Sequence, residues 1–278
     1  METRGAWALV TGGAKRLGKG IAVSLAQAGT SVVVHHGHSA KEAEETVSEI
    51  QGLGVEAFAV AADLTQPVAI ETLFSQIEDR CGGLQVLVNS AASFKRKALH
   101  EISVEEFDDV IDLNLRAPWL CLRQASRLML MNDEMPNVRS PECGVAINIA
   151  DLTGVRSWEG YSHHGVSKAG LIHLTRVAAL ELAPHVRVNC VVPGAILPPP
   201  GMDSDNEQWK QKIAGVPLNR AGNASAVGDA VVSLVRNHFI TGSVLMVDGG
   251  EHLLGGSPAE TLPEGREPLA TRSRKIRS

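Results

Sequence analysis

The chain has 278 residues, of which 44% are hydrophobic and 21% charged, and its formal net charge is −5. This length and composition predict one sizeable folded domain and exclude a largely disordered chain. The acidic balance argues against a nucleic-acid binder, because phosphate binding needs a concentrated basic face. No apolar run approaches the ~18 residues of a membrane span, and the first residues lack a signal-peptide pattern, so we expect a cytoplasmic protein with no membrane partner. The four cysteines are widely spaced, which predicts reduced thiols rather than a disulfide framework or a metal site.

Short β-branched runs alternate with longer amphipathic stretches along most of the chain. The strand-like runs are Ala6–Val10, Ser31–Val34, Ala57–Ala61, Val86–Asn89, Val145–Ile149, Arg187–Val191 and Ser243–Val247. This alternation predicts an α/β protein, with a single Rossmann-type, doubly wound parallel sheet and helices on both faces. Ligands of such sheets bind at the carboxyl ends of the strands, where the strand order reverses. We expect this domain to span residues 1–254.

Two segments break the alternation. Residues 131–143 are polar and contain proline, which predicts a loop. Residues 255–278 lack apolar periodicity, and we expect them to form a mobile C-terminal tail. A basic tail could contact a partner, but its mixed charges favour a solvated extension.

The first predicted strand runs directly into the glycine-rich segment Thr11–Gly18, and a helix is expected from about Lys19. Glycines at a strand-to-helix turn let the backbone approach a pyrophosphate, and the helix N-terminus offers unpaired N–H groups and a positive dipole. A plain tight turn would contain the same glycines. The position at the first strand–helix junction favours nucleotide binding.

The end of the second predicted strand indicates which nucleotide binds. An enzyme that uses NAD usually has Asp or Glu there to hold the ribose 2′-hydroxyl. This chain has no acid at that point, whereas His36, His38 and Ser39, together with Lys15 or Arg16, could bind a 2′-phosphate. The predicted cofactor is therefore NADP(H). The histidines would also suit a metal ion, but no acidic or cysteine ligand lies nearby in the sequence, so we predict no metal site.

Further motifs follow in a fixed order along the chain. They are Asp63-Leu64 at the end of the third strand, Asn89–Ala92, Asn114, the segment Asp151–Lys168, Pro193-Gly194, and Thr241-Gly242 before Val247–Gly250. With the Thr11–Gly18 turn, this series resembles the short-chain dehydrogenase/reductases from about Ala6 to Gly250. The resemblance implies cofactor contacts from Gly12, Lys15, Arg16, Leu17, Gly18, His36, His38, Ser39, Asp63, Leu64, Asn89, Ala91, Lys168, Pro193 and Gly194.

Within that family the chain most resembles the pteridine reductases. These enzymes have arginine at the central glycine of the turn motif, where this chain has Arg16, and aspartate at the usual catalytic serine, where it has Asp151. They also stack a phenylalanine on the pterin, and Phe94 stands at the matching position. Arg16 could be a surface cation, but beside a pyrophosphate it would bridge cofactor and substrate. Phe94 could be a core aromatic, although the basic residues after it indicate an exposed loop.

The family's catalytic signature is Tyr-x-x-x-Lys on a helix, and here the chain departs from it. Counting back four positions from Lys168 gives His164, and Asp151 keeps the family's spacing to that position. Imidazole is shorter than phenol and titrates near ~6.5 rather than ~10, so it is not an equivalent proton donor. The chain's single tyrosine, Tyr161, is expected to pack nearby or to line the substrate site. A second departure is Ala92, where pteridine reductases have serine.

Our hypothesis is a reductase whose acid is the pair His164 and Asp151. Lys168 would hold the nicotinamide ribose, and Asn114 would order the helix and a chain of water molecules. The substrate would be a pterin or another planar carbonyl or imine compound. One alternative is a nucleotide-binding, non-catalytic or regulatory protein that has lost the catalytic tyrosine. Another is a conventional alcohol dehydrogenase that acts on a different substrate.

The region after Gly194 corresponds to the substrate lid of similar enzymes. Three prolines stiffen its entrance, and Met202 and Trp209 could line a flat apolar pocket. A solvent-exposed loop clamped by the prolines would have the same pattern. Broad apolar faces on Glu105–Met131 and His164–Leu182 would form a dimer or tetramer in similar enzymes, although packing on the sheet could equally satisfy them.

Overall fold

The computed structural model describes residues 3–131, 142–199 and 201–254 of the chain. Most of the predicted loop at 131–143 and the whole predicted tail at 255–278 therefore lie outside the described residues. The assignment of residues 1–254 to a single domain stays a prediction.

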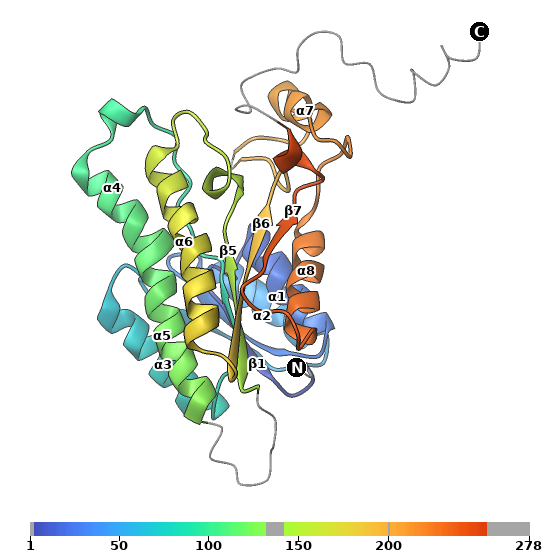
Figure 1. Cartoon of the computed structure of the whole chain (residues 1–278). Helices are drawn as coiled ribbons and strands as arrows, with labels where there is room; N and C mark the ends of the chain where they lie inside the picture. Colours follow the sequence, from blue (N-terminus) through green and yellow to red (C-terminus); the bar gives the residue numbers. More distant parts are fainter. Residues whose placement is uncertain (1–2, 132–141, 200, 255–278) are drawn as a thin grey trace.

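A seven-stranded sheet forms the centre of the molecule (Figure 1). Its strands are β1 Trp7–Val10, β2 Ser31–His36, β3 Ala57–Ala61, β4 Val86–Asn89, β5 Gly144–Ile149, β6 Val186–Pro193 and β7 Val244–Val247. All neighbouring pairs are parallel, and the strand order is β3-β2-β1-β4-β5-β6-β7. The chain reverses its direction of winding between β1 and β4, which defines the edge where a doubly wound sheet binds ligands. The predicted fold class and all seven predicted strands are confirmed.

Helices cover both faces of the sheet. The helices of the described residues are α1 Arg16–Gln27, α2 Ala40–Gln51, α3 Pro67–Cys81, α4 Val104–Ile111, α5 Ala117–Met131, α6 Ser162–Glu181, α7 Glu207–Ala214 and α8 Ala224–Arg236. A π-helical segment lies at Asp112–Arg116, and short 3-10 turns lie at Leu99–Glu101, Leu152–Gly154 and Glu251–Leu253. Helices α1, α2 and α8 share one buried apolar cluster with the sheet, whereas α3, α5 and α6 share the other. Adjacent strand residues divide between these clusters, as Leu9 and Val10 do, because successive side chains point to opposite faces.

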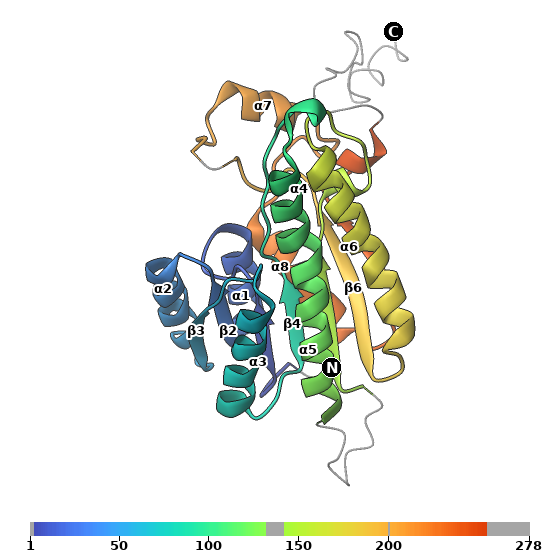
Figure 2. The same cartoon turned by 90° about the vertical axis from the view of Figure 1, so that its left-hand side faces the viewer.

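Long connections gather above the carboxyl ends of the strands. The segment that contains α7 lies at this end of the molecule, as do the beginnings of α4 and α6 (Figures 1 and 2). The reversal of strand order, these connections and the N-terminus of α1 therefore occupy one edge of the sheet. The candidate site is built there.

Candidate active site

The glycine-rich turn is held by hydrogen bonds to the end of β4 and to the segment after it. The backbone N–H of Thr11 donates to the carbonyl of Val88 at 2.9 Å, and the Thr11 hydroxyl accepts from the N–H groups of Ser90 and Ala91 at 2.9 and 3.1 Å. Ala91, a predicted cofactor contact, is thus tied to the turn. Asn89 is buried beneath it, and its amide donates to Asn148 Oδ1 at 2.9 Å.

Gly12 and Gly18 allow the turn to close tightly. Gly12 has φ +66°, and a Cβ added to it would meet the Cα of Ala91 at 3.0 Å. A Cβ at Gly18 would lie 2.1 Å from the Gly12 carbonyl oxygen. A side chain at either position would change the path of the turn, so its backbone stays open to a ligand.

Helix α1 begins at Arg16, three residues before the predicted start at Lys19. The predicted helix start lay too far along the chain because Arg16 has φ +53°. Residues with a side chain rarely adopt this conformation, and the sequence pattern does not reveal it. No side chain caps this helix, and its first turn has no acid. Its first N–H groups have no partner within the helix, and the exposed Lys15 and Arg16 add positive charge. These features fit a phosphate group.

The end of β2 has the same character. His36 is buried, and within the described residues its Nδ1 has no hydrogen-bond partner. His38 is exposed, and Ser39 begins α2 without a side-chain cap. The connection itself has no carboxylate, although the first turn of α2 contains Glu42, so the histidines and the uncapped helix start would accept an additional phosphate.

The predicted adenine contacts lie after β3. Asp63 Oδ1 accepts hydrogen bonds from the N–H and the hydroxyl of Thr65 at 3.0 and 2.7 Å. These bonds lower the pKa of the Asp63 carboxyl. Leu64 is buried between the sheet and α3, so its side chain supports the site from behind.

A buried pair forms the chemical centre of the site. His164 Nε2 lies 2.5 Å from Asp151 Oδ2, and His164 Nδ1 lies 2.8 Å from the carbonyl oxygen of Ser93. The other oxygen of Asp151 accepts from the N–H of Thr153 at 2.8 Å, which fixes the carboxylate at the start of a 3-10 turn. The side chain of His164 is 1% exposed, whereas that of Asp151 is 23% exposed.

Asn114 and Lys168 complete this centre. Asn114 lies in the π-helical segment, and its side-chain amide forms two hydrogen bonds with the backbone of Ser93. It accepts from the Ser93 N–H at 2.8 Å and donates to the Ser93 carbonyl at 3.0 Å. The buried Lys168 ammonium donates to the carbonyl of Ile149 at 2.9 Å. The Asn114 amide nitrogen also lies 3.2 Å from His164 Nδ1, so the structure brings together Asn114, His164 and Asp151, with the positive charge of Lys168 beside them.

The charges of this centre stabilise one another. Burial raises the pKa of Asp151, but the hydrogen bond from His164, the charge of Lys168 and the bond from Thr153 outweigh it and lower the pKa to about 2. Burial lowers the pKa of Lys168, and the charge of Asp151 opposes that change. Asp151 is therefore a carboxylate at neutral pH.

Aromatic rings cover this centre. The ring of Phe94 lies 4.8 Å from that of Tyr161 and meets the ring of His164 edge-on at 4.7 Å. Trp158 continues the series, with its ring centre 5.8 Å from that of Tyr161. Phe94 is 50% exposed, so it presents an open aromatic surface beside the buried pair.

The connection after β6 closes the site from above. Gly194, predicted to contact the cofactor with Pro193, donates its N–H to the carbonyl of Val247 at 3.1 Å. A Cβ on Gly194 would lie 2.6 Å from that of Asp248. Farther along, the Arg16 guanidinium donates to the carbonyl of Pro198 at 2.6 Å, which joins the glycine-rich turn to the connection.

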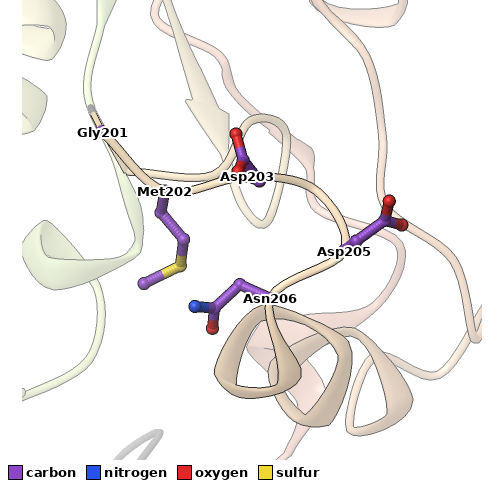
Figure 3. Close-up of a pocket in the computed structure, with 5 residues that line it drawn as sticks. All are labelled: Gly201, Met202, Asp203, Asp205 and Asn206. Atoms are coloured by element: carbon purple, nitrogen blue, oxygen red, sulfur yellow. The ribbon is translucent and has the colours of Figure 1, made fainter.

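Met202 and Trp209, the predicted substrate wall, lie in this connection and in α7. Met202 lines a hollow of about 430 Å³ with Gly201, Asp203, Asp205 and Asn206. Figure 3 shows Met202 and Asn206 extending toward one another, while the two carboxylates point away from them. Trp209 is buried in a small apolar cluster with Ala195 and Val216, so it packs inside this region.

Two interactions were not expected from the sequence. His35 accepts from the Gly12 N–H, and Lys212 of α7 lies 5.0 Å from the Trp158 ring centre. His35 belongs to a histidine-rich strand end, which is only a weak sequence signal for this contact. The Lys212 contact joins segments far apart in sequence and has no local signal.

The described residues also bear on membrane and metal partners. None of the helices there has the length and apolar character needed to cross a bilayer. Within the same residues, no group of three or more histidine, cysteine, aspartate or glutamate side chains is placed to hold a metal ion.

The parallel sheet, the glycine-rich turn and the uncapped helix N-terminus define a dinucleotide-binding α/β protein. Residues 12–252 match the protein family described as enoyl-(acyl carrier protein) reductase. The chain is 32% identical over 249 residues to the 3-oxoacyl-[acyl-carrier-protein] reductase FabG of Staphylococcus aureus, with 88% of this chain and 98% of the relative covered.

Solved structures give the same result. A short-chain dehydrogenase from Burkholderia cenocepacia in complex with NADP has a TM-score of 0.81 and 29% identity, over 90% of this chain and 99% of that one. FolM alternative dihydrofolate reductase 1 from Brucella canis, complexed with NADP, has a TM-score of 0.81 and 30% identity, over 94% of this chain and 100% of that one. The chain belongs to the short-chain dehydrogenase/reductase family, and it is an oxidoreductase of that type.

Proposed function

We propose that this chain is an NADP(H)-dependent reductase of a pteridine-like or other planar carbonyl or imine compound. The observation that carries the proposal is the buried His164–Asp151 pair, which lies beside Lys168 and under the exposed ring of Phe94. This arrangement supplies a proton store, a fixed positive charge and an aromatic surface in one place.

The residues present fit NADP(H). The uncapped start of α1 and the exposed Lys15 would hold the pyrophosphate, while His36, His38 and Ser39 would hold the 2′-phosphate. Lys168 would hold the nicotinamide ribose. When bound, the cofactor supplies the hydride. Two relatives of known structure are complexes with NADP, which supports this choice.

The His164–Asp151 pair would manage the proton. Each ring nitrogen of His164 has an oxygen acceptor within hydrogen-bond distance, Ser93 O for Nδ1 and Asp151 Oδ2 for Nε2, and the Asn114 amide nitrogen also lies 3.2 Å from Nδ1. Because His164 is buried behind Asp151, the carboxylate is the member that a substrate can reach. The proton that His164 holds at Nε2 would therefore be presented at Asp151 Oδ2. Asn114 positions the ring by fixing the backbone of Ser93.

A flat substrate suits the surface beside the pair. The exposed ring of Phe94, with Tyr161 packed against it, would stack on a planar ring, and Arg16 would reach that ring from the turn while bonded to Pro198. The likeness to an alternative dihydrofolate reductase supports a pteridine-like compound over a simple alcohol. The pocket beside α7 would place Met202 at the outer rim of the site and Trp209 behind it.

Self-association is part of the proposal. Phe107 of α4, Trp119 of α5 and Val166 of α6 are exposed apolar side chains on three helices that lie on one face of the sheet. These side chains would be covered in a homodimer or homotetramer. Light scattering on the purified protein would show an assembly, and a Trp119→Glu variant would weaken it.

Titration of the purified protein with NADPH and NADH, followed by fluorescence, tests the cofactor. We expect NADPH to bind tighter by about tenfold or more, since a hydrogen bond to a charged group contributes roughly 1.5–3 kcal/mol. Oxidation of NADPH is then measured with a panel of oxidised pterins, quinones and a 3-oxoacyl thioester. Preference for NADH contradicts the proposal. NADPH binding without turnover on the panel would instead support the non-catalytic alternative.

A further inference from the structure

His35 lies at the end of β2, directly beneath the glycine-rich turn, and three of its atoms hold neighbouring segments. The Gly12 N–H donates to His35 Nδ1 at 3.1 Å, and the Gly13 N–H donates to the His35 carbonyl at 2.9 Å. On the opposite side of the ring, Nε2 lies 3.0 Å from the carbonyl oxygen of Ala62. One buried residue therefore connects the turn, β2 and the segment after β3.

These partners allow one state of the ring. A backbone N–H can only donate, so His35 Nδ1 must be unprotonated and accept from Gly12. A carbonyl oxygen can only accept, so Nε2 must carry a proton and donate to Ala62. The ring is therefore neutral, in its Nε2–H form. Burial, the largest effect, lowers the pKa of His35 to about 4; the bond to Ala62 opposes this change and the neighbouring His36 adds to it.

We propose that neutral His35 is a positioning residue that holds Gly12 and Gly13 in the backbone conformation that binds the cofactor pyrophosphate. This inference rests on the proposed function, because it assumes that NADP(H) occupies the turn. It also gives the adjacent histidines different tasks: His35 faces the turn from inside, whereas His36 and His38 would contact the phosphate itself.

The location supports a role in cofactor binding beyond packing. Gly12 adopts φ +66° and has no side chain that could restrict its backbone, so its conformation depends on contacts with other residues. The two bonds from His35 reach consecutive residues of the turn, just ahead of the N-terminus of α1. Loss of the ring would leave the Gly12 N–H without its buried acceptor and free to reorient, which changes the site that the cofactor meets.

Substitutions can separate the two side-chain bonds. In His35→Asn the amide oxygen stands where Nδ1 was and can still accept from Gly12, whereas in His35→Gln the longer side chain reaches toward Ala62 instead. His35→Leu removes both bonds. We expect the dissociation constant of NADPH to rise by about tenfold or more in His35→Leu and His35→Gln, and clearly less in His35→Asn.

The control is His173→Asn, a change of an exposed histidine on α6, which should leave NADPH binding as in the wild type. Melting temperatures without cofactor are measured for each variant. A purely structural role would lower the stability of His35→Asn and His35→Gln alike and leave NADPH affinity at the wild-type value in folded protein. That result would overturn the inference while the proposed function stands.

A pH series gives a second readout. Other titratable or charged groups of the surrounding segments are His36 and His38 after His35, Lys15 and Arg16 on the turn, and Asp63 after β3. These groups are unchanged in His35→Asn. Dividing the NADPH affinity of the wild type by that of His35→Asn at each pH therefore shows the effect of His35 alone. This ratio should fall as the pH is lowered from 6 toward 4. A constant ratio contradicts the inference.

Nitrogen-15 NMR of the cofactor-free protein tests the ring state independently of the proposed function. We expect one histidine with unprotonated Nδ1 and protonated Nε2 at neutral pH, and its signal should disappear in His35→Asn. A protonated Nδ1 on His35 would overturn the inference even if NADPH binds well. Failure of the wild type to bind NADPH would reject the proposed function, and with it the role of His35 in cofactor binding.

Discussion

His164 Nε2 and Asp151 Oδ2 are 2.5 Å apart, and each of these two residues is fixed by a different part of the chain. Asp151 follows β5 and is fixed by Thr153, whereas His164 belongs to the first turn of α6 and is held against Ser93. The pair therefore joins two independently positioned segments at the carboxyl edge of the sheet. Its geometry depends on both segments being folded.

The first prediction concerns the proton supply. His164→Ala should lower the turnover number for NADPH oxidation by about 100-fold or more, which is the usual contribution of a positioned acid or base. The dissociation constant of NADPH should stay within about twofold of the wild-type value, since the proposed cofactor contacts of the turn are untouched. Steady-state kinetics and fluorescence titration measure the two effects.

His173→Ala is the matched control, because His173 lies on the same helix and is exposed. It should behave as the wild type in both measurements. Unchanged turnover in His164→Ala would remove His164 from the mechanism.

The second prediction concerns acid stability. The pKa of Asp151 is lowered from 3.8 to about 2 in the folded protein, so the ionised carboxylate stabilises the fold above pH 4. That contribution is lost as the pH falls through about 2, and its full size is on the order of 2 kcal/mol. Denaturant unfolding at pH values from 6 to 2 should therefore show a shallower loss of stability in Asp151→Asn than in the wild type. Parallel pH curves for the two proteins would contradict this assignment.

The fold could be predicted because its signals are local. Alternating strand and helix patterns predicted the positions of all seven strands, and the spacing from Asp151 to Lys168 predicted residues that the structure places together. The contacts of the candidate site were harder to predict, since they join segments distant in sequence. Nothing local indicates that His35 accepts from Gly12, or that Arg16 begins α1 with a positive φ.

Trp209 shows that the direction of a side chain is also hard to predict from the sequence. Its place in the sequence fits a substrate wall, but its ring is buried among Ala195 and Val216. Sequence position indicates that a side chain belongs to a region, while packing decides which way it faces. Two strands, β2 and β6, end later than predicted, and β2 continues to His36 because His35 and His36 pair with β3.

The third prediction uses the strained backbone at Arg16. Its φ of +53° favours glycine, so Arg16→Gly should be more stable than Arg16→Ala by about 1 kcal/mol. Both variants lose the bond to Pro198 and should show a similar rise in the Michaelis constant of the substrate. Thermal unfolding and kinetics separate the two effects. Equal stability of the two variants would show that this conformation is not strained.

The fourth prediction concerns the attachment of α7. The Lys212 ammonium lies 5.0 Å from the ring centre of Trp158 and 6.0 Å from that of Trp209, which connects α7 to the aromatic series above His164. Lys212→Met should raise the Michaelis constant of the substrate about two- to fivefold, because a cation–π contact contributes roughly 0.5–1 kcal/mol. Lys212→Arg should retain most of the wild-type behaviour.

Lys210→Met provides the comparison for this helix. Lys210 is exposed and pairs with Glu207 at 2.9 Å, so its loss should leave the Michaelis constant unchanged. An equal effect of Lys210→Met and Lys212→Met would show that charge on α7 matters, and not the contact with Trp158.

The widened turn at Asp112–Arg116 has a consequence for chain length. A π-helical turn accommodates one residue more than an α-helical turn, and here it sets the rotation at which the Asn114 amide meets Ser93. Deleting a single residue between Ile111 and Ala117 would let α4 continue into α5 as a regular helix. The flanking helices would keep nearly the same relative rotation, because the wide turn holds the extra residue, but residues within the turn would move and the Asn114 amide would lose its position against Ser93. Insertions and deletions at this point should therefore be far less tolerated than substitutions on the same helices.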